Sequence, residues 1–322
     1  MSTEYIHFTA EQKEAARQTD LVALLQSQGE HLKRSGKEYV WRDGSEKVTV
    51  RGNLWFHQYE RIGGDAVDFV RRFYNMDFPQ AVNFLLGNNG GALPQAEPVK
   101  REPPKPFTLP PKNDNMRRVY AYLLNRRGID REVLSAFVHK GMIYESADYH
   151  NAVFVGYDEH GIARQAHKRG TGSESTYKGN AESCDPRYSF HWTGKDNALY
   201  LFEAPIDMLS FISLHKENWR SHSYAAACCV GDQVLFQMLK LNPTIDTVYL
   251  CMDNDAAGQA ANKRISDKLF IQGIKHEILV PSLKDWNEDR LAAGGNAPHI
   301  RAEFSLPQEE SEEEEVCQTL QL

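Results

Sequence analysis

Two apolar runs that each end in carboxylates constrain this chain most. The first run, 199–202, ends at Glu203, and the second, 248–252, ends at Asp253. Each run has the length of a buried strand, and a helix-like segment follows it. The strands of an open α/β sheet bind ligands at their carboxyl ends, where the side chains of neighbouring strands meet. We therefore expect these acids to gather at one edge of a sheet.

From residue 198 onward, strand-like and helix-like segments alternate. The expected strands are 198–202, 224–229, 246–252 and 276–280. The expected helices are 205–216, 232–241 and 256–272. Strands that are separated by helical crossovers imply a mostly parallel sheet. The expected fold class is therefore α/β, with a mostly parallel sheet flanked by helices.

Further acids follow the two runs at short spacings. Asp207 comes four residues after Glu203, about one helical turn, so it can face the same side. Asp255 follows Asp253 by two residues, so an extended backbone would point both the same way. Asp285 comes just after the last expected strand. Together these carboxylates could hold one or two divalent ions, Mg²⁺ or Mn²⁺, for phosphoryl chemistry.

Helix capping is the competing interpretation of each acidic motif. An Asp before a helix satisfies the free N–H groups of its first turn, and for any single motif this is the favoured reading. Three motifs in order at the strand ends of one domain favour a shared site instead. Gly258 is expected to let the helix after Asp255 approach closely.

The first half of the chain reads as smaller elements. A helical stretch is predicted at 9–29, with Thr19 and Asp20 able to cap its second half. Short strands are predicted at 39–41, 47–50 and 54–57, and helices at 66–74 and about 78–86. Glycines and prolines predict a linker over 87–112. Two helices, 116–124 and 130–139, and a β-hairpin, 151–157 with 162–168, are predicted next.

Composition narrows the classes of protein to consider. The chain has 322 residues, 41% of them hydrophobic, and a net charge of −7. No apolar run reaches the roughly 20 residues of a membrane helix, and no signal peptide is visible. The five cysteines show no metal-binding spacing, so reduced thiols in a cytoplasmic protein are expected. The acidic excess lies in the C-terminal third and includes the block 309–315, which predicts a solvated, disordered tail. Partner binding or DNA mimicry is the alternative role for this tail.

The segment from about 197 to 290 resembles the toprim domain of bacterial primases, topoisomerases and OLD-type nucleases. The resemblance places the family's signature Glu at Glu203, the helix acid at Asp207, and the final acidic motif at Asp285. The D-x-D motif falls on Asp253 and Asp255. The resemblance implies that Glu203, Asp207, Asp253 and Asp255 are catalytic, and that Glu203, Asp253, Asp255 and Asp285 bind the metal. Asn287 stands where primases often have a second Asp, which would leave a weaker ligand.

The resemblance extends upstream to the primase subdomain that precedes toprim. The hairpin there carries basic residues that, by resemblance, line a groove for template and nucleotide. These residues are Arg164, Lys168, Arg169 and Lys178, together with Lys284 in the toprim segment. Physically, they supply phosphate contacts that carry no sequence information. An ordinary solvated face is the alternative.

Residues 9–87 resemble the primase zinc-binding domain without its ligands. Where that family has one His and three Cys, this chain has Glu38, Trp41, His57 and Glu60. A structural zinc site requires four thiolate or imidazole ligands as a rule. We therefore predict no zinc, a zinc-ribbon-like fold, and a core in which Trp41, Trp55 and Phe56 replace the metal. The surface could still contact single-stranded DNA by stacking.

The full arrangement resembles primase-like toprim proteins of conjugative and other mobile genetic elements. The predicted domains are a zinc-binding-like domain (1–88), a linker (89–112), a primase-like subdomain (113–196), a toprim domain (197–300) and an acidic tail (301–322). The function predicted is a DNA primase-like nucleotidyltransferase in DNA replication or transfer. Its partners would be single-stranded DNA, nucleoside triphosphates, and a replicative helicase or a mobile-element protein. A toprim nuclease and a DNA-binding accessory protein are the alternatives.

Overall fold

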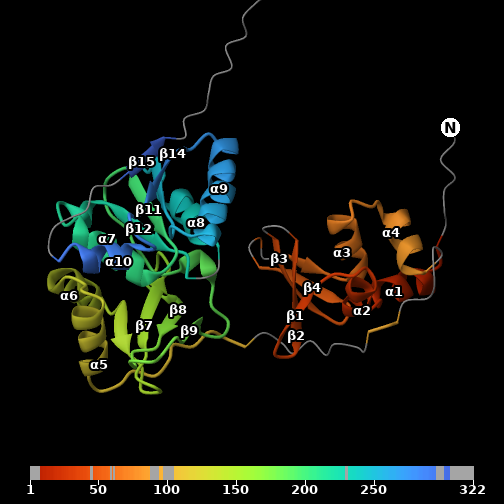
Figure 1. The fold of residues 1–322 in the computed structure, drawn as a ribbon, viewed down its shortest axis with the longest axis horizontal. Helices are drawn as coiled ribbons and strands as arrows, with labels where there is room; N and C mark the ends of the chain where they lie inside the picture. Colours follow the sequence, from red (N-terminus) through yellow and green to blue (C-terminus); the bar gives the residue numbers. More distant parts are fainter. Residues whose placement is uncertain are drawn as a thin grey trace, which may run out of the picture. The chain divides into compact units, whose positions relative to one another are not determined.

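The computed structural model describes most of the chain as two compact units (Figure 1). The described residues are 8–43, 47–58, 60, 62–87, 94–96, 105–228 and 231–294, with the backbone of 46 and 301–304. One unit contains Met1–Pro106, and the other contains most of the chain from Phe107 onward. No helix among the described residues is long and apolar enough to cross a membrane.

The N-terminal unit combines an antiparallel sheet with helices. The sheet has five strands in the order β1-β2-β3-β4-β5. Its strands are β1 (Leu32–Ser35), β2 (Glu38–Asp43), β3 (Glu46–Arg51), β4 (Leu54–His57) and β5 (Gly63–Gly64). Its helices are α1 (Ala10–Arg17), α2 (Leu21–Ser27), α3 (Ala66–Phe73) and α4 (Phe78–Leu85). The three predicted strands and the two helices after them are confirmed, whereas β1 and β5 were not predicted.

The helical stretch predicted at 9–29 consists of two helices, α1 and α2, and the second begins at the predicted cap. Asp20 is the N-cap of α2 and accepts hydrogen bonds from the backbone N–H groups of Val22 (2.8 Å) and Ala23 (3.0 Å). Its extended backbone ends the continuous helix. The backbone N–H of Asp20 donates to the carbonyl of Pro94 at 2.9 Å. The predicted linker thus contributes a backbone contact at this break.

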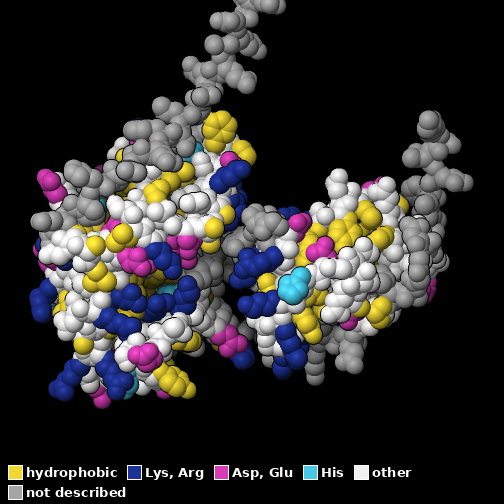
Figure 2. Space-filling model, in the orientation of Figure 1, with side chains coloured by type: hydrophobic (Ala, Val, Ile, Leu, Met, Phe, Trp, Pro, Cys, Tyr) yellow, Lys and Arg dark blue, Asp and Glu magenta, His cyan; other side chains and the backbone are white. Residues whose placement is uncertain are grey.

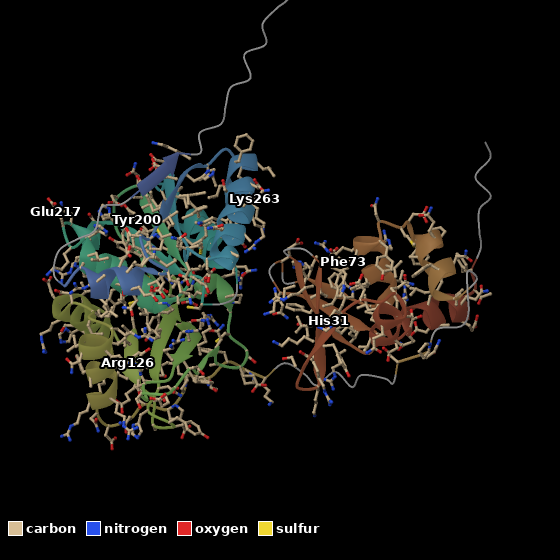
Figure 3. The ribbon with its side chains drawn as sticks, viewed as in Figure 1. His31, Phe73, Arg126, Tyr200, Glu217 and Lys263 are labelled. Atoms are coloured by element: carbon tan, nitrogen blue, oxygen red, sulfur yellow. The ribbon has the colours of Figure 1, made fainter. Side chains whose placement is uncertain are left out.

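Aromatic rings form much of the N-terminal core. Trp41 and Trp55 are 2% and 6% exposed. Both contact Phe73 of α3, which Figure 3 labels, at 5.1 and 5.2 Å between ring centroids. Trp41 and Trp55 are therefore core residues, as predicted. Phe56 is only half-buried, so it does not share that role. The ring of His57 is buried and its Nδ1 lies 3.0 Å from the backbone N–H of Glu60. The zinc-ribbon-like classification stays a prediction.

The second unit begins with helices and a small antiparallel sheet. The helices are α5 (Arg117–Tyr120), which continues into the π-helical turn η1 (Ala121–Arg126), and α6 (Arg131–His139). The sheet, in the order β6-β7-β8-β9, consists of β6 (Ile143–Glu145), β7 (Ala152–Tyr157), β8 (Ala163–Arg169) and β9 (Lys178–Asn180). The predicted hairpin is β7 and β8, while β6 and β9 were not predicted.

A six-stranded sheet follows, in the order β10-β12-β11-β13-β14-β15. Its strands are β10 (His191–Trp192), β11 (Ala198–Phe202), β12 (Ser223–Ala226), β13 (Thr247–Cys251), β14 (Lys275–Val280) and β15 (Arg301–Phe304). The four inner strands are parallel and the two edge strands are antiparallel to their neighbours. The predicted mostly parallel α/β sheet is confirmed.

Helices cover both faces of this sheet (Figure 1). They are α7 (Pro205–Leu214), α8 (Gln233–Leu241), α9 (Ala256–Ile271) and α10 (Trp286–Ala292), with short 3₁₀ turns at η2 (Pro186–Tyr188) and η3 (Trp219–Ser221). Along β11, Leu199 and Leu201 pack with α8 and α9. Phe202 packs on the opposite face with α7 and with Trp286 of α10. This alternation is the period of two expected for a strand.

The core on the α7 face extends into the smaller sheet. The same buried cluster contains Leu123, Phe137 and Phe154 from the segment before residue 197, and Phe202 and Trp286 from the segment after it. Side chains from both segments can therefore be held rigidly against one another. The predicted acidic tail is corrected at its start, because Arg301–Phe304 forms strand β15 beside β14. The acidic block 309–315 of the tail lies outside the described residues.

Candidate functional site

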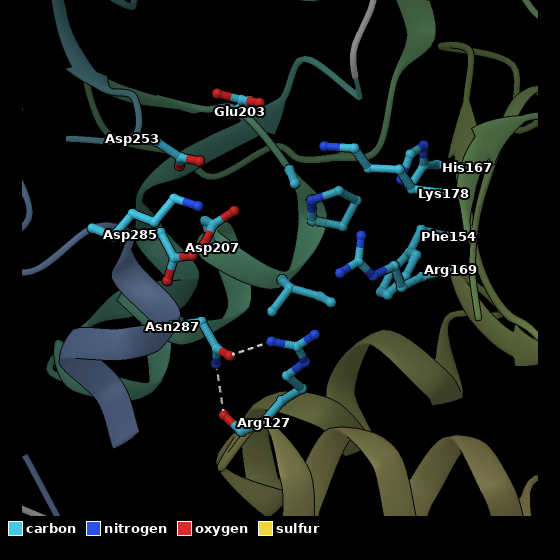
Figure 4. Close-up of a pocket in the computed structure, with 14 residues that line it drawn as sticks. Arg127, Phe154, His167, Arg169, Lys178, Glu203, Asp207, Asp253, Asp285 and Asn287 are labelled. Carbon is cyan, nitrogen blue, oxygen red and sulfur yellow. Dashed lines mark hydrogen bonds between the residues drawn. The ribbon is translucent and has the colours of Figure 1, made fainter. Parts of the chain in front are cut away.

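One cavity of about 190 Å³ joins the carboxyl edge of the parallel sheet to the small sheet. Carboxylates line one side: Glu203, Asp207, Asp253 and Asp285. Cations line the cavity as well: Arg127, Arg169, Lys178 and Lys284. Figure 4 shows the aspartates on one side of the cavity and Lys178, His167 and Arg169 on the other. The expected gathering of acids at one edge is what the structure shows for these four.

Glu203 and Asp207 occupy the turn from β11 into α7. Glu203 is the residue after β11, and Asp207 lies in the first turn of α7. Burial raises the pKa of Glu203, while Lys178 acts in the opposite direction. Asp207 is only 6% exposed, and burial beside Asp253 raises its pKa well above the usual range. The surroundings of both side chains therefore disfavour the ionised form of the carboxyl group.

Asp253 is the least satisfied of the cavity acids. It follows β13, and its Oδ1 is buried with no hydrogen-bond partner. Burial, reinforced by the negative charges of Glu203 and Asp285, raises its pKa to about 7. A buried carboxylate oxygen without a donor is costly unless a cation or a proton compensates it. The oxygen is thus a candidate ligand for a positive ion.

Asp255 has a different position from the one predicted. Its Oδ1 caps α9 by accepting from the backbone N–H groups of Ala257 (3.0 Å) and Gly258 (2.9 Å), and it does not line the cavity. A Cβ atom at Gly258 would lie 1.9 Å from the carbonyl oxygen of Asp253. The predicted close approach of this helix is therefore confirmed, and capping accounts for one oxygen of Asp255.

The loop before α10 carries Lys284 and Asp285 to the cavity. Asp285 caps α10 by accepting from the backbone N–H of Glu288 at 2.8 Å. The buried carboxylate of Asp289 accepts from two loop N–H groups, those of Ser282 and Leu283. The backbone N–H of Asn254 donates to the carbonyl of Lys284 at 2.8 Å. The two acidic loops are therefore tied to each other.

The predicted basic residues separate into two groups. Arg169, Lys178 and Lys284 line the cavity. Lys168 lines a different cavity of about 580 Å³ and lies over the ring of Tyr177. Arg164 forms an ion pair with Asp158 at 2.7 Å and does not line the cavity of the carboxylates. Figure 2 shows Lys and Arg side chains gathered beside acidic ones on the visible face of this unit.

Asn287 joins the cavity floor to the segment after η1, a role that sequence reasoning missed. Its Oδ1 accepts from Nη1 of Arg127 at 3.0 Å (Figure 4), and its Nδ2 donates to the carbonyl of Arg127 at 2.8 Å and to Oγ of Ser210 at 2.9 Å. All of its amide groups are therefore engaged by protein. Asn287 thus holds the guanidinium of Arg127, which also lines the cavity.

His167 is the other residue that sequence reasoning missed. It lies on β8 two residues before Arg169, and it lines the same cavity while Lys168 lines the other. Neighbouring residues of a strand face opposite sides, so this spacing was a usable signal. Burial lowers the pKa of His167 to about 4, with Arg169 and Lys178 adding to the effect of burial. The imidazole is neutral at pH 7.

The donor set of the cavity suits a hard divalent cation. Mg²⁺ is usually held by one or two carboxylates, with water and phosphate completing its shell. The described residues contain no three His, Cys, Asp or Glu groups already placed to hold a metal ion. Asp253 nevertheless offers a buried oxygen without a partner, next to three more carboxylates. These residues fit Mg²⁺ or Mn²⁺ that is also bound by phosphate.

Comparison with known families matches the sheet that carries the acids. A family model described as Toprim-like matches residues 200–290. This segment is a toprim-like domain. A second model, described as a protein of unknown function (DUF3991), matches residues 121–196, which contain the small sheet.

Two curated relatives of the chain are described as uncharacterized proteins. An uncharacterized protein of Bacillus anthracis is 24% identical over 274 residues, covering 80% of this chain and 79% of the relative. An uncharacterized protein of Mycoplasma genitalium is 30% identical over 104 residues, covering 32% of this chain and 45% of the relative.

Solved structures with similarity to the chain include primase fragments. The zinc-binding and RNA polymerase domains of the Aquifex aeolicus primase are 16% identical, with 89% of this chain and 83% of that chain covered and a TM-score of 0.38. The primase fragment of the bacteriophage T7 primase-helicase protein is 20% identical, with 60% and 79% covered and a TM-score of 0.41.

Proposed function

We propose that this protein is a DNA primase-like, metal-dependent nucleotidyltransferase that acts on single-stranded DNA. The observation that carries the proposal is the shared cavity of the toprim-like domain and the small sheet, in which four carboxylates lie opposite Arg169 and Lys178. Joining a nucleoside triphosphate to a 3′-hydroxyl requires cations for the phosphates and carboxylates for metal ions. Both are present within one site.

The residues of the cavity would divide this work. Mg²⁺ or Mn²⁺ would be held by Glu203, Asp253 and Asp285, and when bound would neutralise the charge that develops on the phosphates. Asp255 would support this set through the oxygen that does not cap α9. Asp207 is buried next to the other acids, and we assign it to keeping them in place and to carrying a proton.

The cations would hold the substrate. Arg169 and Lys178 would bind the triphosphate, Arg127 would be aimed at it by Asn287, and Lys284 would lie on the metal side. Lys168 and Arg164, which do not line this cavity, would contact the template backbone instead. Such phosphate contacts are independent of base sequence. A replicative helicase or a mobile-element transfer protein would be the protein partner.

Synthesis of labelled RNA on single-stranded DNA with Mn²⁺ tests the proposal. We expect new labelled products from the wild type. We expect at least a 100-fold loss in Asp253→Asn and in Glu203→Gln, because removing one preorganised charge-stabilising group costs about 100- to 1,000-fold in many enzymes. Asp267→Asn, on an exposed part of α9, is the matched control and should keep full activity.

Three results would contradict the proposal. Shortened DNA that depends on Asp253 would identify a nuclease, in which the same acids position water. Binding of single-stranded DNA without synthesis or cleavage under any divalent ion would identify an accessory protein. Full synthesis by Asp253→Asn would move the active site elsewhere.

A further inference from the structure

His167 lies among the basic side chains that line the cavity. Of the described residues that line it, His167 is the one with an uncharged ring nitrogen that forms no hydrogen bond. His167 is 2% exposed and lines the cavity beside Lys178 (Figure 4). Its Nδ1 is hydrogen-bonded to Asn180, and no other hydrogen bond is formed by the ring within the part of the chain that the structure describes. Nε2 is therefore available to a ligand.

The hydrogen bonds of Asn180 fix which nitrogen of His167 carries the proton. Nδ2 of Asn180 donates to the carbonyl of Cys228 at 2.9 Å, so Oδ1 must point the other way. Oδ1 accepts from Nε2 of Gln165 at 3.0 Å and lies 2.8 Å from Nδ1 of His167. An amide oxygen only accepts hydrogen bonds, so Nδ1 of His167 must donate. In the neutral ring, Nε2 is then a bare acceptor.

Because Nε2 of His167 can only accept a hydrogen bond, it can bind only those groups of a nucleotide that donate one. Burial keeps the ring neutral, with its pKa lowered to about 4, so Nε2 does not become a donor at pH 7. Phosphate oxygens are acceptors and cannot bond to it. Arg169, two residues along on the same face of β8, is suited to the phosphates. The donors nearest to the phosphates of a nucleotide are the hydroxyl groups of its sugar.

We propose that Nε2 of His167 accepts a hydrogen bond from a ribose hydroxyl of a nucleoside triphosphate bound in this cavity. His167 then favours ribonucleotides over nucleotides that lack that hydroxyl. This inference rests on the proposed function for the identity of the ligand. It adds a residue that determines specificity for the sugar, and it assigns no proton transfer to the imidazole.

Two substitutions separate the two nitrogens of the ring. His167→Asn keeps an amide N–H near the position of Nδ1, which can still donate to Asn180, but it removes the acceptor at Nε2. His167→Gln places an amide near Nε2 and so keeps an acceptor toward the cavity. The melting temperature of each full-length variant reports whether it folds. Only the first variant should lose selection of the sugar.

The experiment measures dissociation constants of ATP, 2′-deoxy-ATP and 3′-deoxy-ATP for the full chain with Mg²⁺. We expect the wild type to bind ATP about three- to tenfold more tightly than one of the two deoxy compounds, the range of one neutral hydrogen bond. The weaker compound identifies the hydroxyl. His167→Asn should bind all three equally, and His167→Gln should retain part of the preference.

Several outcomes would overturn the inference. These are equal binding of the three compounds by the wild type, an unchanged preference in His167→Asn, or a uniform weakening of all three in that variant. If the wild type binds none of them, the inference and the proposed function both fail. If the preference is present and depends on His167 but no RNA is made, the proposed function fails and the inference stands.

Discussion

The partly buried carboxylate of Asp253 makes the stability of the metal-free protein depend on pH. Its Oδ1 is buried without a partner, and burial raises its pKa from 3.8 to about 7. The metal-free folded protein therefore keeps a proton on Asp253 between about pH 4 and pH 7, whereas the unfolded chain has released it. Stability is lost as the pH rises through this window, and Asp253 causes no further loss above it.

Asp253→Asn should stabilise the metal-free protein at pH 8. The expected gain is about 1–2 kcal/mol, which is less than the full pKa shift implies because the side chain is partly exposed. Thermal unfolding with a chelator at pH 5 and pH 8 measures it, and the gain should shrink at pH 5. Mg²⁺ should raise the melting temperature of the wild type but not that of Asp253→Asn. A less stable variant at pH 8 would contradict the role given to burial.

Asn287 connects α10 to Arg127 and Ser210 through hydrogen bonds, and an experiment can distinguish this role from that of a metal ligand. Asn287→Ala removes three hydrogen bonds with Arg127 and Ser210, which should cost about 2 kcal/mol of stability. Because Arg127 is then no longer held, ATP binding should weaken severalfold. Mg²⁺ should still raise the melting temperature of the variant. Loss of that Mg²⁺ effect would make Asn287 a ligand after all.

The turn from β13 into α9 requires a glycine for its close packing. A Cβ atom at Gly258 would lie 1.9 Å from the carbonyl oxygen of Asp253, so the start of the helix would have to move. Gly258→Ala should therefore cost about 1–3 kcal/mol and weaken the stabilisation by Mg²⁺, since Asp253 moves too. Gly172→Ala is the matched control, because its Cβ would meet only Ser175 at 3.7 Å. Equal melting temperatures for the two variants would contradict this account.

The strand β8 shows how far a pattern along the chain can lead. Arg169 and Lys168 were predicted to share one groove, yet they line different cavities. Neighbouring residues of a strand face opposite sides, so Lys168 and Arg169 must separate. Residues two apart face the same side, so Arg169 and His167 share one cavity. The sequence showed which residues are basic, but the prediction did not separate the two faces of the strand. The partner of Arg164, Asp158, lies six residues away across the hairpin.

The two compact units should unfold as separate transitions. Each has its own buried core, with Leu24 in the N-terminal unit and Leu250 in the second, both 0% exposed. A Leu→Ala change in a core costs about 2–5 kcal/mol. In calorimetry, Leu24→Ala should lower one transition and Leu250→Ala the other. A single transition that both substitutions lower equally would show one cooperative unit instead.

The sequence by itself determined the elements whose signals are local. Periodicity located the parallel strands and their helices, and the short spacing of Asp20 before Leu21 predicted a cap that the structure contains. The positions of Glu203 and Asp253 at strand ends predicted that they would meet, because parallel strands end at a common edge. Short strands such as β6 and β9 carry too few residues for a periodic signal.

Only the tertiary structure decided what lies opposite the acids. Arg127 and Asn287 are 160 residues apart in the chain, and they meet because both segments pack against one core. The backbone conformation after β13 likewise decides that Asp255 caps α9 and that Oδ1 of Asp253 has no hydrogen-bond partner. Spacing along a sequence determines which side chains can share a face. The distances between faces are set by packing, which joins residues that no local pattern relates.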